Sequence, residues 1–529
     1  MLKICNHQQP FLIDPWSHLG AKRRSILEKS WAGVFRNFLL YKLPVEEIIS
    51  TFCPDNGRPT KDIRVVVGAL ILQQMHDLTD KSAVEAISFN IMWHYSLNML
   101  NEEDCYICER TLRTYRKLLI DRGLDSVIFK NLTDELLQKF NVDTSRQRLD
   151  STSIRSAMRT LTRLGILVET MSKFLRELCR KFPSIYSVIE SQIVDRYVRK
   201  EGDNCFSLTR PSEAKNRLPE AAEDIYNYLS RFKDSEVSDL ASYQLLERVF
   251  NEHIEVTGNG ECPASFSFQV RAPKSISCES VQNPSDPDAS YNAHRGQGYM
   301  MQVMEVYSVD NDKSKGESDS ADLITHVSVD KMTVHDSKCL EPALLETKSR
   351  GIKPETVLAD SHYGSSDNLS LGAKHGTTII APSFPPKGHK QNRITLEQFE
   401  LDEAGFVLRC PVGLKPFKIS SVKSRFQANF ERSICQKCSC LDRCPVRIEK
   451  KASRLRYTSD RVKQRKRRIF QESEFFKNQY RWRAGIEGSI SRLKNQMKLG
   501  FLRVRGMRSV QYVCILRALG LNIFRCAKV

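Results

Sequence analysis

Apolar residues recur every three or four positions along the first part of the chain. The pattern runs through SWAGVFRNFLLYKL, VEEIISTF and the long segment DIRVVVGALILQQMHDL, and this spacing is typical of helices that bury one face. It follows an irregular lead-in over residues 1–20 and persists to residue 140. We therefore expect an all-helical N-terminal domain over residues 1–140.

A different pattern, of short apolar runs bounded by turn residues, predicts a β-sheet farther along. Asp150 lies in one such run, RQRLDSTSI, and residues 299–307 and 323–329 form two more. The segment ETVLADSHYGSSDNLSLGAKHGTTIIAP then has the pattern of strand, turn, helix and strand, with Asp360 directly after the strand 356–359. These runs predict a mixed α+β or α/β core, a mixed β-sheet flanked by helices, built from residues 141–154 and 297–383.

Two long segments interrupt this core. Residues 155–296 are mostly amphipathic and helical in pattern, and they end in a stretch rich in Gly, Pro and Ser. Asp286 and Asp288 flank Pro287 there, and we expect them to form a turn. The second insertion, residues 384–470, begins with the sequence SFPPKGHKQN.

Local pattern leaves the role of three aspartates open. We expect Asp336, which follows the third strand, to cap the helix that contains Leu340 and Leu344. Asp150 and Asp360 also occupy positions where a plain capping or turn role is common.

The last part of the chain, residues 471–529, contains YRWRAGIEGSISRLK at positions 480–494. We expect this stretch to form one helix with an apolar stripe that packs on the core, followed by a second apolar helix from about residue 510. At 100° per residue four polar side chains fall within an arc of roughly 60°. They are Tyr480, Arg483, Glu487 and Lys494.

Two glycines lie inside the same stretch. Gly485 and Gly488 would each cost about 1 kcal/mol in a helix interior, so they indicate that another group approaches closely there. The plainer alternative is an amphipathic surface helix whose cations flank one glutamate.

The charge of the chain points to a polyanionic partner. Lys and Arg number 81 against 63 Asp and Glu, which gives a net charge of +18 and a pI near 9.2. Residues 445–470 hold eleven Lys and Arg against Glu449 and Asp460, a net charge of +9. With aromatic residues close by, this run is typical of a segment that follows a nucleic-acid backbone, and a merely soluble basic surface is the alternative.

The sixteen cysteines are expected to be reduced thiols, because MLKICNHQQP lacks the pattern of a signal peptide. No apolar run is long enough to span a bilayer, so we expect a cytoplasmic protein with no membrane role. Cysteine spacings in CQKCSCLDRC, together with the upstream CPVG, suit tetrahedral zinc, with Cys440 as the spare thiol and a set of plain thiols as the alternative. The expected ligands are Cys410, Cys435, Cys438 and Cys444.

The spacing Tyr-x2-Arg-x3-Glu-x6-Lys matches, without a gap, the YREK signature of a superfamily of bacterial insertion-sequence transposases, the DDE enzymes. The helical segment around GRPTKDIRVVVGALILQQM also resembles the domain that precedes the catalytic core in many of them. Asp150-Ser151-Thr152 and the step from Asp360 to Tyr363-Gly364 resemble the two aspartate motifs of the family.

This resemblance implies an RNase H-like core whose catalytic, metal-binding carboxylates are Asp150, Asp360 and Glu487. They would hold two Mg²⁺ or Mn²⁺ ions, one to activate a water or a DNA 3′-hydroxyl and the other to stabilise the leaving oxygen. The DNA-binding residues implied are Tyr480, Arg483 and Lys494, which would contact the phosphates of the transposon end.

The activity implied is DNA cleavage and strand transfer at the ends of an insertion sequence, by a homodimer on paired ends that also contacts target DNA. The N-terminal domain could bind the ends or serve in dimerisation. Two alternatives stay open: an RNase H-like nuclease that cuts without joining, and a catalytically inactive DNA-binding regulator derived from a transposase.

Overall fold

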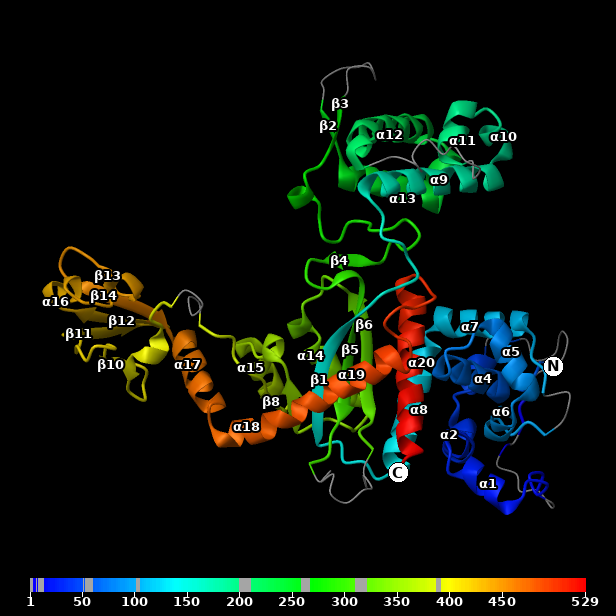
Figure 1. Ribbon diagram of the computed structural model, residues 1–529, viewed down its shortest axis with the longest axis horizontal. Helices are drawn as coiled ribbons and strands as arrows, with labels where there is room; N and C mark the ends of the chain where they lie inside the picture. Colours follow the sequence, from blue (N-terminus) through cyan, green and yellow to red (C-terminus); the bar gives the residue numbers. More distant parts are fainter. Residues whose placement is uncertain are drawn as a thin grey trace.

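The structure is a computed structural model that describes residues 3–5, 7, 14–50, 52, 60–100, 105–198, 211–257, 267–309, 321–386 and 392–529, with the backbone alone over 211–216. A central body carries two separate extensions, one above the sheet and one to its side in the view of Figure 1. No helix in the described part of the chain is both long and apolar enough to cross a membrane.

The central body is built on one mixed sheet. Its main strands are β1 (Arg146–Ile154), β5 (Gly296–Val306), β6 (Ile324–Lys331), β7 (Thr356–Ala359) and β8 (Thr378–Ile380). They lie in the order β6-β5-β1-β7-β8, and the short β4 (Ser290–Asn292) pairs with the start of β5. Strand β5 is antiparallel to both β1 and β6, whereas β7 is parallel to β1 and β8 is parallel to β7. The predicted mixed sheet and the predicted strands are therefore present.

The apolar runs of the sequence follow from the position of each strand. Every residue of β5 from Gly298 onward is buried, because β5 lies inside the sheet with both faces covered. Helices α14 (Leu340–Ser349) and α15 (Ser366–Lys374) connect the strands at the β7 and β8 side. Parallel pairing places Leu149 of β1 opposite Ala359 of β7, so β7 ends beside the middle of β1.

The described regular elements of the N-terminal region are all helical, as the spacing predicts. Its helices are α1 (Ala21–Glu28), α2 (Trp31–Val34), α3 (Glu46–Ile49), α4 (Ile63–Met75), α5 (Asp80–Phe89), α6 (Ile91–Ser96), α7 (Glu109–Arg122) and α8 (Leu124–Lys139), with a π-helical turn at Phe35–Leu39. The long C-terminal helix α20 (Met507–Cys526) lies between these helices and the sheet (Figure 1). Side chains from α4, α8, α20, β5 and β6 share one hydrophobic core.

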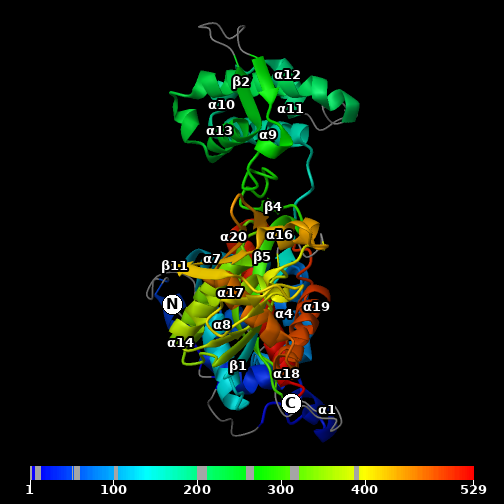
Figure 2. The same cartoon turned by 90° about the vertical axis from the view of Figure 1, so that its left-hand side faces the viewer.

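The first insertion is a separate helical extension with its own hydrophobic core. It consists of α9 (Arg163–Lys181), α10 (Pro183–Tyr186), α11 (Ser191–Tyr197), α12 (Pro211–Phe232) and α13 (Ala241–His253), and Figure 2 shows it beyond the end of the sheet. A small hairpin, β2 (Ile254–Thr257) and β3 (Ser267–Val270), was not predicted.

Asp286 and Asp288 do more than form a turn. Asp286 accepts hydrogen bonds from the hydroxyl of Tyr299 and from the backbone N–H of Gly506, and Asp288 accepts one from the N–H of Met507 at 3.0 Å. These carboxylates therefore hold the start of α20, where helical N–H groups lack partners within the helix.

The second insertion contains small antiparallel sheets around a third core. Its elements are β9 (Glu400–Leu401), β10 (Val407–Arg409), β11 (Lys418–Val422), β12 (Arg425–Phe430), α16 (Arg432–Gln436), β13 (Arg447–Ile448) and β14 (Ser453–Thr458). Helix α17 (Ser459–Gln471) then leads back to the central body, where α18 (Glu474–Tyr480) and α19 (Gly485–Asn495) cross the sheet (Figure 1).

Candidate active site

The stretch 480–494 is not one helix, contrary to our expectation. Helix α18 ends at Tyr480, a 3₁₀ turn spans Arg481–Ala484, and α19 begins at Gly485. The carbonyl of Trp482 inside this turn accepts a hydrogen bond from Nη1 of Arg148, at 2.9 Å. A bond from a distant side chain, beside a glycine with low helix propensity, accounts for the break.

Arg483 connects two of the three predicted carboxylates. Its Nη2 lies 2.7 Å from Oδ2 of Asp150, and its Nη1 lies 2.9 Å from Oε1 of Glu487. Asp150 is buried on β1, whereas 66% of the Glu487 side chain is exposed. The Arg483 guanidinium therefore joins strand β1 to helix α19. Asp150 and Arg483 are 333 positions apart in the sequence.

Asp360 lies directly after β7, whose last residue, Ala359, pairs with Leu149, the residue before Asp150 on β1. Its Oδ1 accepts a hydrogen bond from the N–H of His362 at 2.9 Å, so it caps a short 3₁₀ turn. Its charge also reaches the site, because it raises the pKa of the Asp150 carboxyl group. The predicted turn role of Asp360 is thus present.

The electrostatics of the site are dominated by burial. Burial raises the pKa of Asp150 above its ordinary value, and the neighbouring Arg483 and the N–H of Ser151 offset only part of this rise. For Arg483, burial acts to lower the guanidinium pKa, but the charges of Asp150, Asp360 and Glu487 reverse the sign and raise it. All three carboxylates therefore act on the same cation.

Tyr480 and Lys494 complete the YREK spacing, with Tyr480 at the end of α18 and Lys494 near the end of α19. The ring of Tyr480 stacks on Phe476 with 5.4 Å between the centroids, and burial raises the pKa of its hydroxyl. Lys494 is in the last turn of α19, and burial, with a smaller contribution from Arg295, lowers the pKa of its ammonium group.

Asp336 belongs to this region, and our expectation that it caps a helix is wrong. Helix α14 begins at Leu340 with Cys339 in the capping position. Asp336 is buried and forms an ion pair with Arg295, with Oδ2 at 2.8 Å from Nη2, and it too raises the pKa of Asp150. The local sequence pattern does not predict this ion pair, because Arg295 and Asp336 are 41 positions apart.

Helix α17 uses much of its positive charge to attach the second insertion. Several of its cations donate hydrogen bonds to backbone carbonyls of other segments. The pairs are Arg465 to Phe399, Lys466 to Glu403, Arg467 to Gly364 and Arg468 to Phe384. Arg461 and Lys463 are exposed and donate no such bond to the described residues.

The cysteines of the second insertion line one pocket with Ile434 and Leu441. This group contains Cys410, Cys435, Cys438 and Cys444, together with the spare Cys440. All five are free thiols of intermediate exposure. Thiolate sulfur is a suitable donor for zinc.

Within the described ranges, no group of three or more His, Cys, Asp and Glu residues is arranged so that it could hold a metal ion. At the carboxylates, the guanidinium of Arg483 lies between Asp150 and Glu487. The donor chemistry does suit a divalent ion, because carboxylate oxygens are the ligands that Mg²⁺ and Mn²⁺ prefer.

Comparison with known proteins gives two family matches. Residues 34–118 match the model of a transposase domain (DUF772), and residues 409–527 match that of a transposase DDE domain. The second match includes all four residues of the YREK spacing. No curated protein and no solved structure matches the chain. Together the two family matches indicate a transposase of the DDE kind.

Proposed function

We propose that this chain is a transposase of the YREK superfamily that cleaves DNA at the ends of an insertion sequence and joins those ends to target DNA. The observation that carries the proposal is the contact of Arg483 with both Asp150 and Glu487. Two predicted catalytic carboxylates from distant parts of the sequence thereby meet at one cation, beside Asp360.

The topology supports an RNase H-like core for this enzyme. In the order β6-β5-β1-β7-β8, the central strand β1 carries Asp150, and the parallel strand β7 beside it is followed directly by Asp360. Helix α19 crosses this sheet and supplies Glu487. On this basis we divide the chain as the sequence predicts, with a core over residues 141–154 and 297–383, insertions over 155–296 and 384–470, and flanking segments 1–140 and 471–529.

Asp150, Asp360 and Glu487 would hold Mg²⁺ or Mn²⁺, which when bound stabilises negative charge on the oxygens of the phosphodiester under attack. The chain's own cations have a separate task. Arg483 and Lys494 would neutralise phosphate charge, and a partly buried guanidinium is well suited to this because it donates two parallel hydrogen bonds to phosphate oxygens. Tyr480, stacked on Phe476, would hold its hydroxyl toward the DNA end.

The partners proposed are the transposon ends and target DNA, bound in the cytoplasm by a homodimer. The cysteine pocket is proposed as a structural zinc site on donor chemistry.

The test is a cleavage and strand-transfer assay on the element's own DNA ends with Mg²⁺. We expect Glu487→Gln to lose both activities by at least about 100-fold while it still binds the ends, because the substitution removes a negative charge that the reaction needs. Glu474→Gln, the same change at an exposed glutamate of α18, is the matched control and should behave like the wild type.

Three results would change the proposal. If the wild type cuts but never joins, the protein is a nuclease. If Glu487→Gln cuts and joins as well as Glu474→Gln, the proposed mechanism is wrong. If the wild type binds the ends and does neither, it acts as a DNA-binding regulator.

A further inference from the structure

A buried group of charges lies directly below α19. Glu305 of β5 is fully buried, and its Oε1 accepts hydrogen bonds from Nε of Arg148 at 2.7 Å and from Oγ of Ser489 at 2.8 Å. Its Oε2 accepts one from Nη1 of Arg525, at 3.0 Å. A buried carboxylate is costly unless it is fully paired, so this network is tolerated only because each oxygen has a cationic donor.

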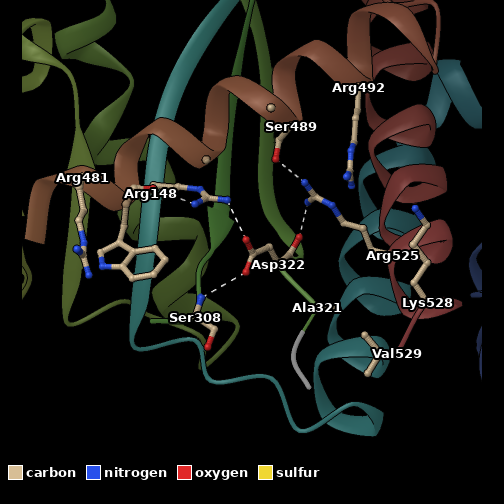
Figure 3. Close-up of a pocket in the computed structure, with 13 residues that line it drawn as sticks. Arg148, Ser308, Ala321, Asp322, Arg481, Ser489, Arg492, Arg525, Lys528 and Val529 are labelled. Atoms are coloured by element: carbon tan, nitrogen blue, oxygen red, sulfur yellow. Dashed lines mark hydrogen bonds and ion pairs between the residues drawn. The ribbon is translucent and has the colours of Figure 1, made fainter. Parts of the chain in front are cut away.

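Arg148 extends this network to the turn above the active site. Its Nη2 lies 2.9 Å from Oδ2 of Asp322, and its Nη1 donates to the carbonyl of Trp482 at 2.9 Å. Figure 3 shows the Arg148 side chain below the ribbon of the turn, with Asp322 between it and Arg525. All three nitrogens of the Arg148 guanidinium therefore donate hydrogen bonds that hold the side chain in place.

Two hydrogen bonds join β1 to the Arg481–Ala484 turn, one donated by the strand and one donated by the turn. Arg148 donates to the carbonyl of Trp482, and the next residue, Arg483, donates to Asp150. Arg148 and Asp150 are two residues apart on β1, so their side chains point to the same face of the sheet. Neighbouring residues of the turn are thus held against alternate residues of the strand that carries the first carboxylate.

The surroundings of Gly485 and Gly488 show which group approaches this stretch closely. A Cβ on Gly485 would lie 2.1 Å from Nη1 of Arg148, whereas a Cβ on Gly488 would meet nothing within 4 Å. The predicted close approach is therefore present at Gly485, where a guanidinium approaches, and absent at Gly488 among the described residues. Because Arg148 is held by Glu305 and Asp322, it cannot move aside without breaking those bonds.

We propose that Arg148 is a positioning residue, which sets the Arg481–Ala484 turn so that Arg483 and Glu487 face Asp150. The proposal rests on the transposase function proposed above. Through Glu305 and Arg525, the same network connects the turn to the last part of α20. Arg148 does not touch the reacting atoms; it acts through the turn.

The test compares two glycine substitutions in one helix. Gly485→Ala displaces the guanidinium of Arg148, and Gly488→Ala is the matched control because its new methyl group has free space. We expect Gly485→Ala to lower kcat for end cleavage by about 100-fold with KM for the DNA end within about threefold of wild type, since a shift of about 1 Å at a catalytic group costs roughly that factor. Gly488→Ala should keep the wild-type kcat.

Arg148→Lys is the second variant. It keeps the positive charge beside Glu305 but loses the planar guanidinium that donates to three groups at once. Hydrogen exchange of the amides in residues 481–487, measured on the full-length protein, gives a readout that needs no catalysis. We expect faster exchange there in Gly485→Ala and Arg148→Lys than in Gly488→Ala. Wild-type exchange in both variants would overturn the proposal, as would a Gly485→Ala enzyme that cleaves as fast as Gly488→Ala.

Failure of the proposed function would look different. If the wild type cleaves nothing, the transposase proposal fails, and the exchange data alone decide whether Arg148 sets the turn. If the wild type cleaves and Gly485→Ala does also, the enzyme proposal stands and only the positioning role is lost.

Discussion

The basic helix α17 offers a sharp test of which cations bind DNA. Its sequence alone predicts one continuous nucleic-acid-binding run, but the structure divides its cations into two classes. Arg467 donates to the carbonyls of Gly364 at 2.8 Å and Ala381 at 3.4 Å, and burial lowers its guanidinium pKa. Arg461 and Lys463 are exposed.

We therefore predict that the double variant Arg461→Ser, Lys463→Ser weakens DNA binding mainly through salt-dependent contacts. Each lost phosphate contact lowers the slope of log K against log salt by about 0.9, so two contacts lower it by about 1.8. Between about 50 and 200 mM salt, the wild type should then lose about 12-fold more affinity than the double variant does.

Arg467→Ser should behave in the opposite way. It removes hydrogen bonds from a charged donor to two backbone carbonyls, each worth about 1.5–3 kcal/mol, and so should lower the melting temperature while it leaves the salt slope unchanged. Fluorescence anisotropy with a labelled DNA end over a salt series, and thermal unfolding of each variant, measure the two quantities. The division fails if Arg467→Ser lowers the slope as much as the double variant, or if the double variant keeps the wild-type slope.

Two further predictions concern the other groups of the site. The protein purified without chelators should contain about one zinc per chain, lost in Cys444→Ser and kept in Cys440→Ser, as measured by elemental analysis; a metal-free wild type would contradict this. Burial raises the pKa of Asp150 in the folded state, so its stabilising contribution is present at low pH and is lost as pH rises through the folded pKa. Asp150→Asn should therefore melt above the wild type at pH 7.5, by a margin that shrinks toward about pH 4, and a lower melting temperature at neutral pH would refute the reasoning.

The parts of the fold that follow from the sequence are those with a local pattern. The strands around Asp150 and before Asp360 are short apolar runs, and their burial inside one sheet preserves that pattern. The N-terminal helices are equally visible, because each buries one face at helical spacing. The position of Glu487 follows from a resemblance in spacing, not from periodicity.

The features that the sequence does not predict are set by partners far away along the chain. The break in the stretch 480–494 depends on Arg148, which is 334 positions from Trp482. Asp336 has the local pattern of a cap, and only the fold brings Arg295 to it. Likewise, the cations of α17 form one run in the sequence, and tertiary contacts decide which of them face solvent.

The N-terminal helices, which give one family match, pack against α20, the last helix of the segment that gives the other. Helix α4 is buried along almost its whole length, and a Cβ on Gly520 of α20 would lie 3.0 Å from the side chain of Met75. A side chain packed this closely against a glycine resists sliding of α4 along α20. Arg525 of the same helix contacts Glu305, which contacts Arg148. Packing of α4 on α20, and the contacts from α20 through Glu305 to Arg148, therefore connect the N-terminal helices to the strand that carries Asp150.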